Sequence, residues 1–419
     1  MRAPVLLKLS FRSVGRHARR SALTASAMVI GLALLIFSRS LSDGGHEQWI
    51  DSAVRLGTGH IAIQAPEYLE TGKLDHRLDS ARASRAASAV EKVLAQQALA
   101  WAPRLSVNGL ASSAASALPA RIIGVDPERE ARFSDIDEKV QDGRYLGPED
   151  RLHAYVGVEL ARRLELRVGS RFVLTAQSAT GDIEGQLVRV AGIFRTAIPE
   201  IDEGLIHVPI WTVREWLRTP GAVTTVATLL ASSRMTTPAV SSLEEELSTE
   251  SGIRVLGWQE AAPELESAIR LDDYGDYVFH IILFAIVALA ILNAVIMSVL
   301  GRRREFGLLQ ALGLTAGETG WVVFGEGLLL TALSGVVGIA LGYLFTWVFF
   351  RDGLDFSGLI ENEMSFSGGI MEPVIVPVFY LKHVLISVYF ILIIGTLASI
   401  YPAIRASRLD PAEAVKVEQ

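Results

Sequence analysis

Four apolar stretches constrain the fold of this chain more than any other feature of its sequence. They occupy residues 22–41, 278–300, 321–350 and 384–404. Because an α-helix rises about 1.5 Å per residue, about 20 apolar residues are enough to cross the roughly 30 Å hydrocarbon core of a membrane. The sequence therefore predicts four transmembrane helices.

The segment between the first two stretches has a different composition. Half of the 419 residues are hydrophobic and the mean hydropathy is +0.35, yet residues 42–277 carry charges throughout and contain only short apolar runs. A segment of this length can form a large soluble domain. The predicted fold class is an α-helical membrane protein with a large α+β extracytoplasmic domain.

Within residues 42–277, the spacing of apolar residues changes along the chain. Alternation predicts strands at 59–64 and 120–125, and an amphipathic pattern predicts a helix at 81–97. Predicted strands become more frequent between about 126 and 218. We interpret the domain as an α/β, porter-like part with a β-rich part inserted at about 126–218.

The N-terminal segment 1–21 contains six basic residues and no acidic one. This pattern predicts a cytoplasmic amphipathic helix on the membrane surface, although the same charges could serve only to orient the chain. The stretch 22–41 could alternatively be a cleavable signal peptide. Its length and the missing small-residue cleavage site favour a retained first transmembrane helix.

The distribution of Lys and Arg predicts the orientation. The loop 301–320 and the tail 405–419 carry three basic residues each, whereas the loop 351–383 carries two against five acids. Loops rich in Lys and Arg stay in the cytoplasm. Both termini and the 301–320 loop are therefore expected inside, and the large domain and the 351–383 loop outside. The predicted location is the inner membrane, with several passes.

Composition excludes several classes of function. The net charge of -7 argues against nucleic acid as a partner, and the absence of cysteine excludes disulfides and thiol catalysis. The eight His residues show no metal-ligand spacing, and the chain contains no nucleophile motif and no phosphate-binding P-loop. We expect no catalytic residue, no metal site and no ATP site in this chain.

The predicted loop at 301–320 begins with a cluster of charges. Three arginines at 302–304 precede Glu305. A stop-transfer signal that only sets orientation would explain them. However, Phe306 and Leu309 recur at helical spacing, which predicts a short amphipathic helix with an arginine rim. Such a helix is suited to docking a protein, because Arg forms bidentate pairs with carboxylates.

Two motifs extend this interpretation to a family. They read NAVIMSVLGRRREFGLLQALG at 293–313 and YPAIRASRLDPAEA at 401–414. With the order of the apolar stretches, they resemble FtsX-like ABC transporter permeases, the group that includes MacB-like and lipoprotein-releasing (Lol-type) proteins. GHIAI at 59–63 and GLDFS at 353–357 are more similar to the Lol-type branch. MacB-like proteins also carry a fused ATPase, which this sequence lacks.

The resemblance implies how the 301–320 loop works. In this family the loop forms a coupling helix on a cytoplasmic ABC ATPase dimer, which binds ATP and Mg in place of the permease. Its hydrolysis of ATP moves the outer domain, a mechanism called mechanotransmission. The residues implied in ATPase coupling are Arg303, Arg304, Glu305, Phe306, Gly307, Ala311 and Gly313.

Polar and small residues within the apolar stretches are candidates for helix packing. Glu326 is expected either to contact an arginine or another helix, or to snorkel to the cytoplasmic interface. Asn293 is expected to make an interhelical hydrogen bond. Gly335, Gly338 and Gly342 form a small-residue face suited to close helix packing, within the chain or across a dimer.

Two functions follow from the resemblance. In the first, the chain pairs with a second copy or a paralogue and extracts or exports a lipoprotein or other hydrophobic client, with a periplasmic lipoprotein or adaptor as partner. The alternative is an FtsX-like regulator that activates cell-wall hydrolases. The size of the predicted outer domain disfavours this alternative.

Overall fold

The computed structural model describes residues 12, 18–196, 198–356, 364–366, 369–371 and 374–408. The chain divides into two compact units. The helix domain comprises residues 1–45, 272–355 and 374–419, and the sheet domain comprises residues 46–271 and 356–373. Most of the N-terminal surface helix predicted at 1–21 and most of the predicted tail lie outside the described residues, and residues 18–21 belong to the first long helix.

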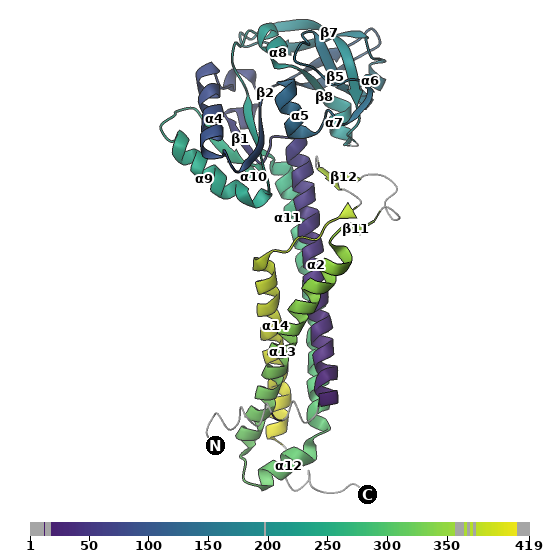
Figure 1. Ribbon diagram of the computed structural model, residues 1–419, viewed down its shortest axis with the longest axis vertical. Coiled ribbons are helices and arrows are strands. Elements are labelled where there is room, and N and C mark those ends of the chain that lie inside the picture. The colour runs from purple at the N-terminus through teal and green to yellow at the C-terminus, as the bar shows by residue number, and fades with distance from the viewer. Residues whose placement is uncertain are drawn as a thin grey trace. The chain divides into compact units, whose positions relative to one another are not determined.

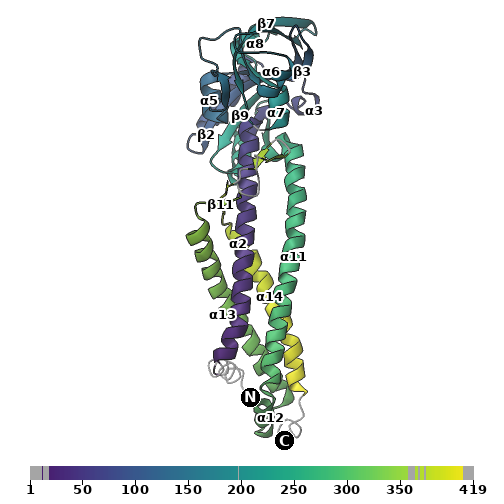
Figure 2. The same ribbon diagram turned by 90° about the vertical axis from the view of Figure 1, so that its right-hand side faces the viewer.

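In its described residues, the helix domain contains four long helices and one short helix (Figures 1 and 2). Two of the long helices also continue into the sheet domain. Two small strands form an antiparallel pair between the last two long helices. The elements are α2 Ala18–Leu56, α11 Pro263–Leu300, α12 Arg303–Ala311, α13 Ala316–Phe350, β11 Leu354–Asp355, β14 Val374–Ile375 and α14 Leu381–Ser407.

Three helices in the described part of the chain are long and apolar enough to cross a membrane. They are Met28–Leu56 of α2, Ala316–Phe350 and Leu381–Ser407. The predicted fourth, at 278–300, is helical as part of α11, but several of its side chains lie outside the described residues. The count of four therefore stays a prediction.

The helices α2 and α11 extend beyond the boundaries expected from hydropathy. The first apolar stretch was expected to end at residue 41, but α2 continues to Leu56. Likewise, α11 begins at Pro263 rather than near residue 278. The extensions are helical because they bury amphipathic faces: Trp49 of α2 and Leu265 of α11 lie in the same hydrophobic core.

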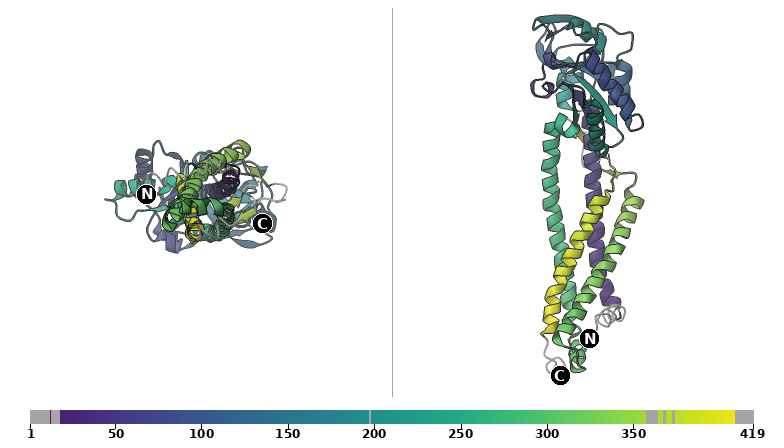
Figure 3. Two further views of the ribbon diagram at one scale, coloured as in Figure 1. Left: turned by 90° about the horizontal axis from the view of Figure 1, so that it is seen from below. Right: turned by 90° about the vertical axis from the view of Figure 1, so that its left-hand side faces the viewer.

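Small residues allow α13 and α14 to approach closely (Figure 3). A Cβ atom added to Gly327 of α13 would overlap the Ser399 side chain of α14. In the reverse direction, a Cβ added to Gly395 of α14 would overlap Thr331 of α13. Membrane helices associate through such close contacts, because lipid offers no hydrophobic drive between them.

The described residues of the sheet domain form ten strands in one sheet and a separate small hairpin. The strands are β1 Ile61–Gln64, β2 Ala98–Ser112, β3 Ala117–Val125, β4 Val140–Gly143, β5 His153–Gly157, β6 Arg171–Gln177, β7 Ile183–Phe194, β8 Leu205–Pro209, β9 Thr225–Leu230, β10 Arg254–Gly257, β12 Met364–Phe366 and β13 Gly369–Met371. The helices are α3 Tyr68–Thr71, η1 Leu74–His76, α4 Ser80–Val93, α5 Pro127–Ser134, α6 Val158–Arg163, α7 Pro199–Gly204, α8 Ile210–Trp216, η2 Ser233–Met235, α9 Thr236–Leu247 and α10 Trp258–Ala261.

Six strands of this sheet close into a barrel. The strand order is β10-β1-β9-β2-β3-β8-β5-β7-β4, and β6 pairs with both β2 and β7. The ring is thus β2-β3-β8-β5-β7-β6 and back to β2. The long strand β2 makes this possible, because residues 98–104 pair with β9 and residues 109–112 pair with β6. Closure leaves these strands without open edges.

The barrel differs in its boundaries from the β-rich insertion predicted at 126–218. It includes β2 and β3, which precede residue 126. The sequence did not predict β2, because Pro103 and Gly109 interrupt its apolar pattern. The β-rich part therefore begins within the strand that also belongs to the α/β part.

The α/β part buries both faces of its central strand β9. Val226 and Leu230 contribute to the large core that includes residues of α4 and α9. Ala227 and Leu229 belong to a second core with Trp49 of α2. Since successive side chains of a strand point to opposite faces, helices cover this sheet on both sides.

A buried polar cluster is formed by residues in the middle of β2 and β8 and by a glutamate of α5. The Nε atom of Arg104 donates to Oε2 of Glu130 at 2.9 Å, and both side chains are buried. Burial lowers the pKa of the nearby His207 to about 4, although the Glu130 carboxylate partly opposes this shift. The Arg104 guanidinium holds the pKa of Glu130 below its usual value against the opposing effect of burial. His207 is therefore neutral in the folded protein at neutral pH.

We expect His207 to make the sheet domain less stable in mild acid. The unfolded chain binds a proton at its ordinary pKa near 6.5, and the folded chain only near pH 4. Stability should therefore fall as the pH drops from about 6.5 to 4, by about 3 kcal/mol. In the His207→Gln variant, the free energy of unfolding, measured by proteolysis at several pH values, should not show this fall.

The control is His76→Gln, because His76 lies on η1 outside the hydrophobic cores. It should keep the slope of the unsubstituted protein. An unchanged slope in His207→Gln would show that another group causes the acid sensitivity.

Candidate functional site

The turn after α12 has a fixed geometry. Gly313 has a φ of 106°, which favours glycine. Thr315 then caps α13: its hydroxyl accepts from the Glu318 backbone N–H at 3.3 Å, and the Glu318 carboxylate accepts from the Thr315 N–H at 2.9 Å. This reciprocal capping box sets the direction in which α13 leaves the turn.

A buried ion pair joins the beginning of α12 to α13. The Nη1 atom of Arg302 lies 2.8 and 2.6 Å from the two carboxylate oxygens of Glu326, and its Nε atom lies 3.0 Å from Glu305. Arg302 is 6% exposed and Glu326 is 7% exposed. The structure agrees with one of the two expectations for Glu326, because its carboxylate contacts an arginine. Sequence reasoning had treated Arg302 as part of an orientation signal or of an exposed arginine rim, not as a buried partner of Glu326.

The outer face of α12 exposes both charge and apolar surface. Arg304, Leu308 and Leu312 follow one another at intervals of four residues, so they lie on one face of the helix. Leu308 is 57% exposed and Leu312 is 74% exposed. Single exposed leucines are common on protein surfaces, but two adjacent ones beside an arginine form a patch suited to a protein partner.

The predicted coupling residues occupy different positions around α12. Arg304, Ala311 and Gly313 are exposed, whereas Gly307 is buried. Glu305 is half-buried against Arg302 rather than part of an exposed rim. The side chains of Arg303 and Phe306 lie outside the described residues.

The predicted packing residues are divided between two environments. A Cβ atom on Gly338 would come 3.0 Å from Leu32 of α2, and one on Gly342 would come 3.0 Å from Ala33. A Cβ atom on Gly335 would meet no described atom within 4 Å. Asn293 is exposed on α11, so its interhelical hydrogen bond stays a prediction.

A second charged cluster connects three helices, and we call it the charged clasp. The Nε atom of Arg39 on α2 lies 3.2 Å from Oδ1 of Asp43, and its Nη1 atom lies 3.2 Å from Oδ2 of Asp276 on α11. The Nδ1 atom of His383 on α14 lies 2.6 Å from Oδ2 of Asp43. Sequence reasoning missed this cluster. An arginine four residues before an aspartate at the end of an apolar stretch was the available signal.

Comparisons with known proteins identify the family. The description of the family model that matches residues 277–411 is FtsX-like permease C-terminal. The MacB-like periplasmic core domain model matches residues 21–246, more than half of the chain. The chain belongs to the FtsX/MacB family of ABC transporter permeases. The resemblance drawn from the two sequence motifs is thus confirmed.

Two relatives found by sequence agree with this assignment. The lipoprotein-releasing system transmembrane protein LolC of Xylella fastidiosa is 27% identical over 316 residues, 72% of this chain and 73% of LolC. The uncharacterized ABC transporter permease YvrN of Bacillus subtilis is 23% identical over 98% of this chain and 99% of its own length. The periplasmic region of MacB from Actinobacillus actinomycetemcomitans is 12% identical, with a TM-score of 0.36 over 51% of this chain and 95% of that region.

These findings place the permease in a membrane context. Its three apolar helices and its MacB-like core indicate an inner membrane protein with a periplasmic domain. The orientation of the termini stays a prediction. Relatives of this type are permease components of ABC transporters, so the chemistry of ATP hydrolysis is not expected in this chain.

Removal of Arg302 should destabilise the helix domain. The Arg302→Met variant leaves the Glu326 carboxylate buried without its arginine, which costs about 3–5 kcal/mol for buried pairs. The double variant with Glu326→Leu should recover most of the lost stability, because apolar residues often replace buried ion pairs without loss. Thermal unfolding in detergent micelles measures both effects.

The matched control is Arg351→Met, at an exposed pair with Asp352 at the other end of α13. It should change the unfolding temperature little, since exposed pairs contribute little. A double variant as unstable as Arg302→Met would contradict the assigned role of the ion pair.

Proposed function

We propose that the permease is the membrane subunit of a machine in which a separate cytoplasmic ABC ATPase dimer binds the exposed face of α12. The observation that carries this proposal is a patch of Arg304, Leu308 and Leu312 on a helix whose beginning is fixed to α13 by a buried ion pair. A helix attached in this way can transmit a push. ATP and Mg are bound by the ATPase.

The proposed output is mechanotransmission to the sheet domain. Both α2 and α11 are single helices that contain apolar membrane stretches and end in the core of the sheet domain, at Trp49 and Leu265. An unbroken helix resists compression along its axis, because each turn is hydrogen-bonded to the next. Movement of the membrane helices is therefore passed to the sheet domain. A second copy or a paralogue completes the dimer.

The proposed client is a lipoprotein or another hydrophobic molecule, handled with a periplasmic adaptor or carrier. The LolC relatives are named for lipoprotein release, and the MacB-like core spans residues 21–246. Release of lipoproteins from spheroplasts should stop when the permease is depleted. Loss of cell-wall hydrolase activation with normal lipoprotein release would instead favour the FtsX-like regulator.

Substitutions on the outer face of α12 should release the ATPase. In the variant Leu308→Asp/Leu312→Asp, a carboxylate would have to be buried at the interface at each position, which is unfavourable without a partner. We expect at least a tenfold loss of the protein that copurifies with the permease and is labelled by a photoreactive ATP analogue.

The matched control is Ile183→Asp on β7, where the isoleucine is 78% exposed in the sheet domain. It should leave the labelled protein in place. An undiminished ATPase signal in the α12 variant, with normal insertion of the permease, would refute docking at this face.

A further inference from the structure

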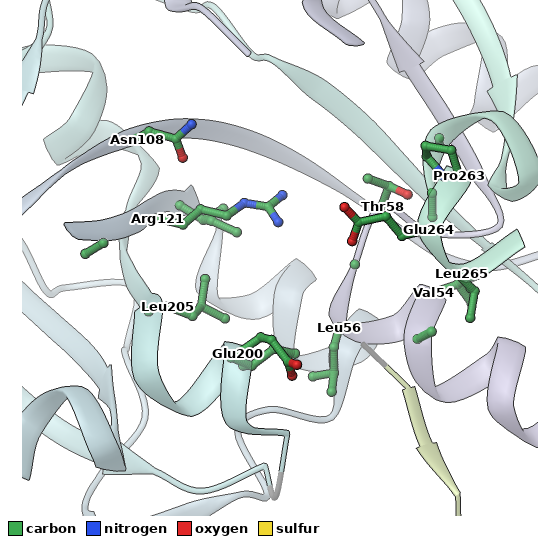
Figure 4. Close-up of a pocket in the computed structure, with 18 of the residues that line it drawn as sticks. Val54, Leu56, Thr58, Asn108, Arg121, Glu200, Leu205, Pro263, Glu264 and Leu265 are labelled. Atoms are coloured by element: carbon green, nitrogen blue, oxygen red, sulfur yellow. The ribbon is translucent and has the colours of Figure 1, made fainter. Parts of the chain in front are cut away.

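The sheet domain contains a cavity of about 650 Å³ (Figure 4). Its walls come from the end of α2, the beginning of α11, the strands β2 and β3, and the segment from α7 to β8. Small-molecule sites are typically cavities of roughly 300–1,000 Å³ with apolar walls and a few polar groups. The large apolar side chains of the wall are Val54, Leu56, Ile123, Ile201, Leu205 and Leu265.

One wall of the cavity carries a cation. Arg121 of β3 is paired in register with Asn108 of β2 and Leu205 of β8, so the three side chains lie side by side. Its Nε atom donates to the Ser106 hydroxyl at 3.2 Å. Among the described residues no carboxylate lies within ion-pair distance of Arg121. The guanidinium therefore has further N–H donors for an anionic group.

Two anionic side chains from different elements line the cavity. Glu264 lies in the first turn of α11, and Glu200 lies in the first turn of α7. Figure 4 shows the Glu264 carboxylate and the Arg121 guanidinium pointing toward one another across the cavity. In the part of the chain that the structure describes, neither carboxylate forms an ion pair. The cavity thus presents opposite charges among apolar side chains.

We propose that this cavity binds a small zwitterionic molecule with an apolar body. Its anionic group lies at Arg121 and Asn108, and its cationic group lies at Glu264, while Glu200 adds a second negative charge to the lining. An uncharged molecule of the same shape would leave these groups without partners after it displaced their water, which is unfavourable. A purely anionic molecule would approach two carboxylates. The site is distinct from the ATPase docking face on α12, so it goes beyond the proposed function.

The test uses the full-length permease in lipid nanodiscs, with empty nanodiscs subtracted. The zwitterionic probes are trileucine with free termini and dodecylphosphocholine, and their uncharged counterparts are acetyl-trileucine-amide and dodecyl maltoside. Saturation-transfer NMR gives the dissociation constants. We expect at least one zwitterion to bind tenfold or more tightly than its counterpart, and the two arms distinguish a peptide-like from a lipid-like ligand.

Variants assign the binding to this cavity. We expect the dissociation constant of the preferred zwitterion to rise at least tenfold in Arg121→Gln and in Glu264→Gln. It should not change in Arg171→Gln on β6, because Arg171 is exposed and lies outside the cavity. Thermal unfolding checks the folding of each variant. If Arg121→Gln is unstable, Glu264→Gln decides, since Glu264 is exposed. Equal binding of the uncharged counterparts, or unchanged binding in the Glu264 variant, would overturn the proposal.

Discussion

The ion pair between Arg302 and Glu326 is the interaction on which the α12 end of the helix domain depends. Both groups are buried, and the arginine also contacts Glu305. A lone carboxylate in an apolar helix would be costly, and so would a lone guanidinium. The pair is stable only when the turn before α12 lies against α13. The requirement to neutralise two charges thus determines where the short helix sits.

At the other ends of the helices, charge again determines the arrangement. The charged clasp brings Arg39, Asp276 and His383 together from three helices that are distant in the sequence. Between these two polar clusters, small residues determine the packing, as at Gly327 and Gly395. The helix domain therefore combines polar contacts near its ends with close backbone contacts in its interior.

The parts of the fold that depend on neighbouring residues could be predicted from the sequence, and those that depend on residues distant in the chain could not. Local signals were sufficient for β1 and α4, and for the apolar stretches. The extension of α2 to Leu56 was missed, because residues 42–56 are apolar only on the face that includes Trp49 and Val54. The barrel was missed in part because closure requires β6 to pair with both β2 and β7. No local pattern encodes a ring.

The candidate site, too, could be predicted from the sequence only in part. The motif at 293–313 predicted a docking helix, and the family assignment that it implied is confirmed. It did not predict that Arg302 points inward while Arg304 is exposed, since adjacent arginines look alike in sequence. That distinction depends on Glu326, a residue more than twenty positions further along the chain.

The contact between α13 and α2 has a consequence for assembly. Gly338 and Gly342 already pack against Leu32 and Ala33 of the same chain. In the dimer that we propose, a neighbouring protomer would have no access to these two glycines. Because this glycine surface is used within the protomer, contacts between protomers could rearrange without separating α13 from α2.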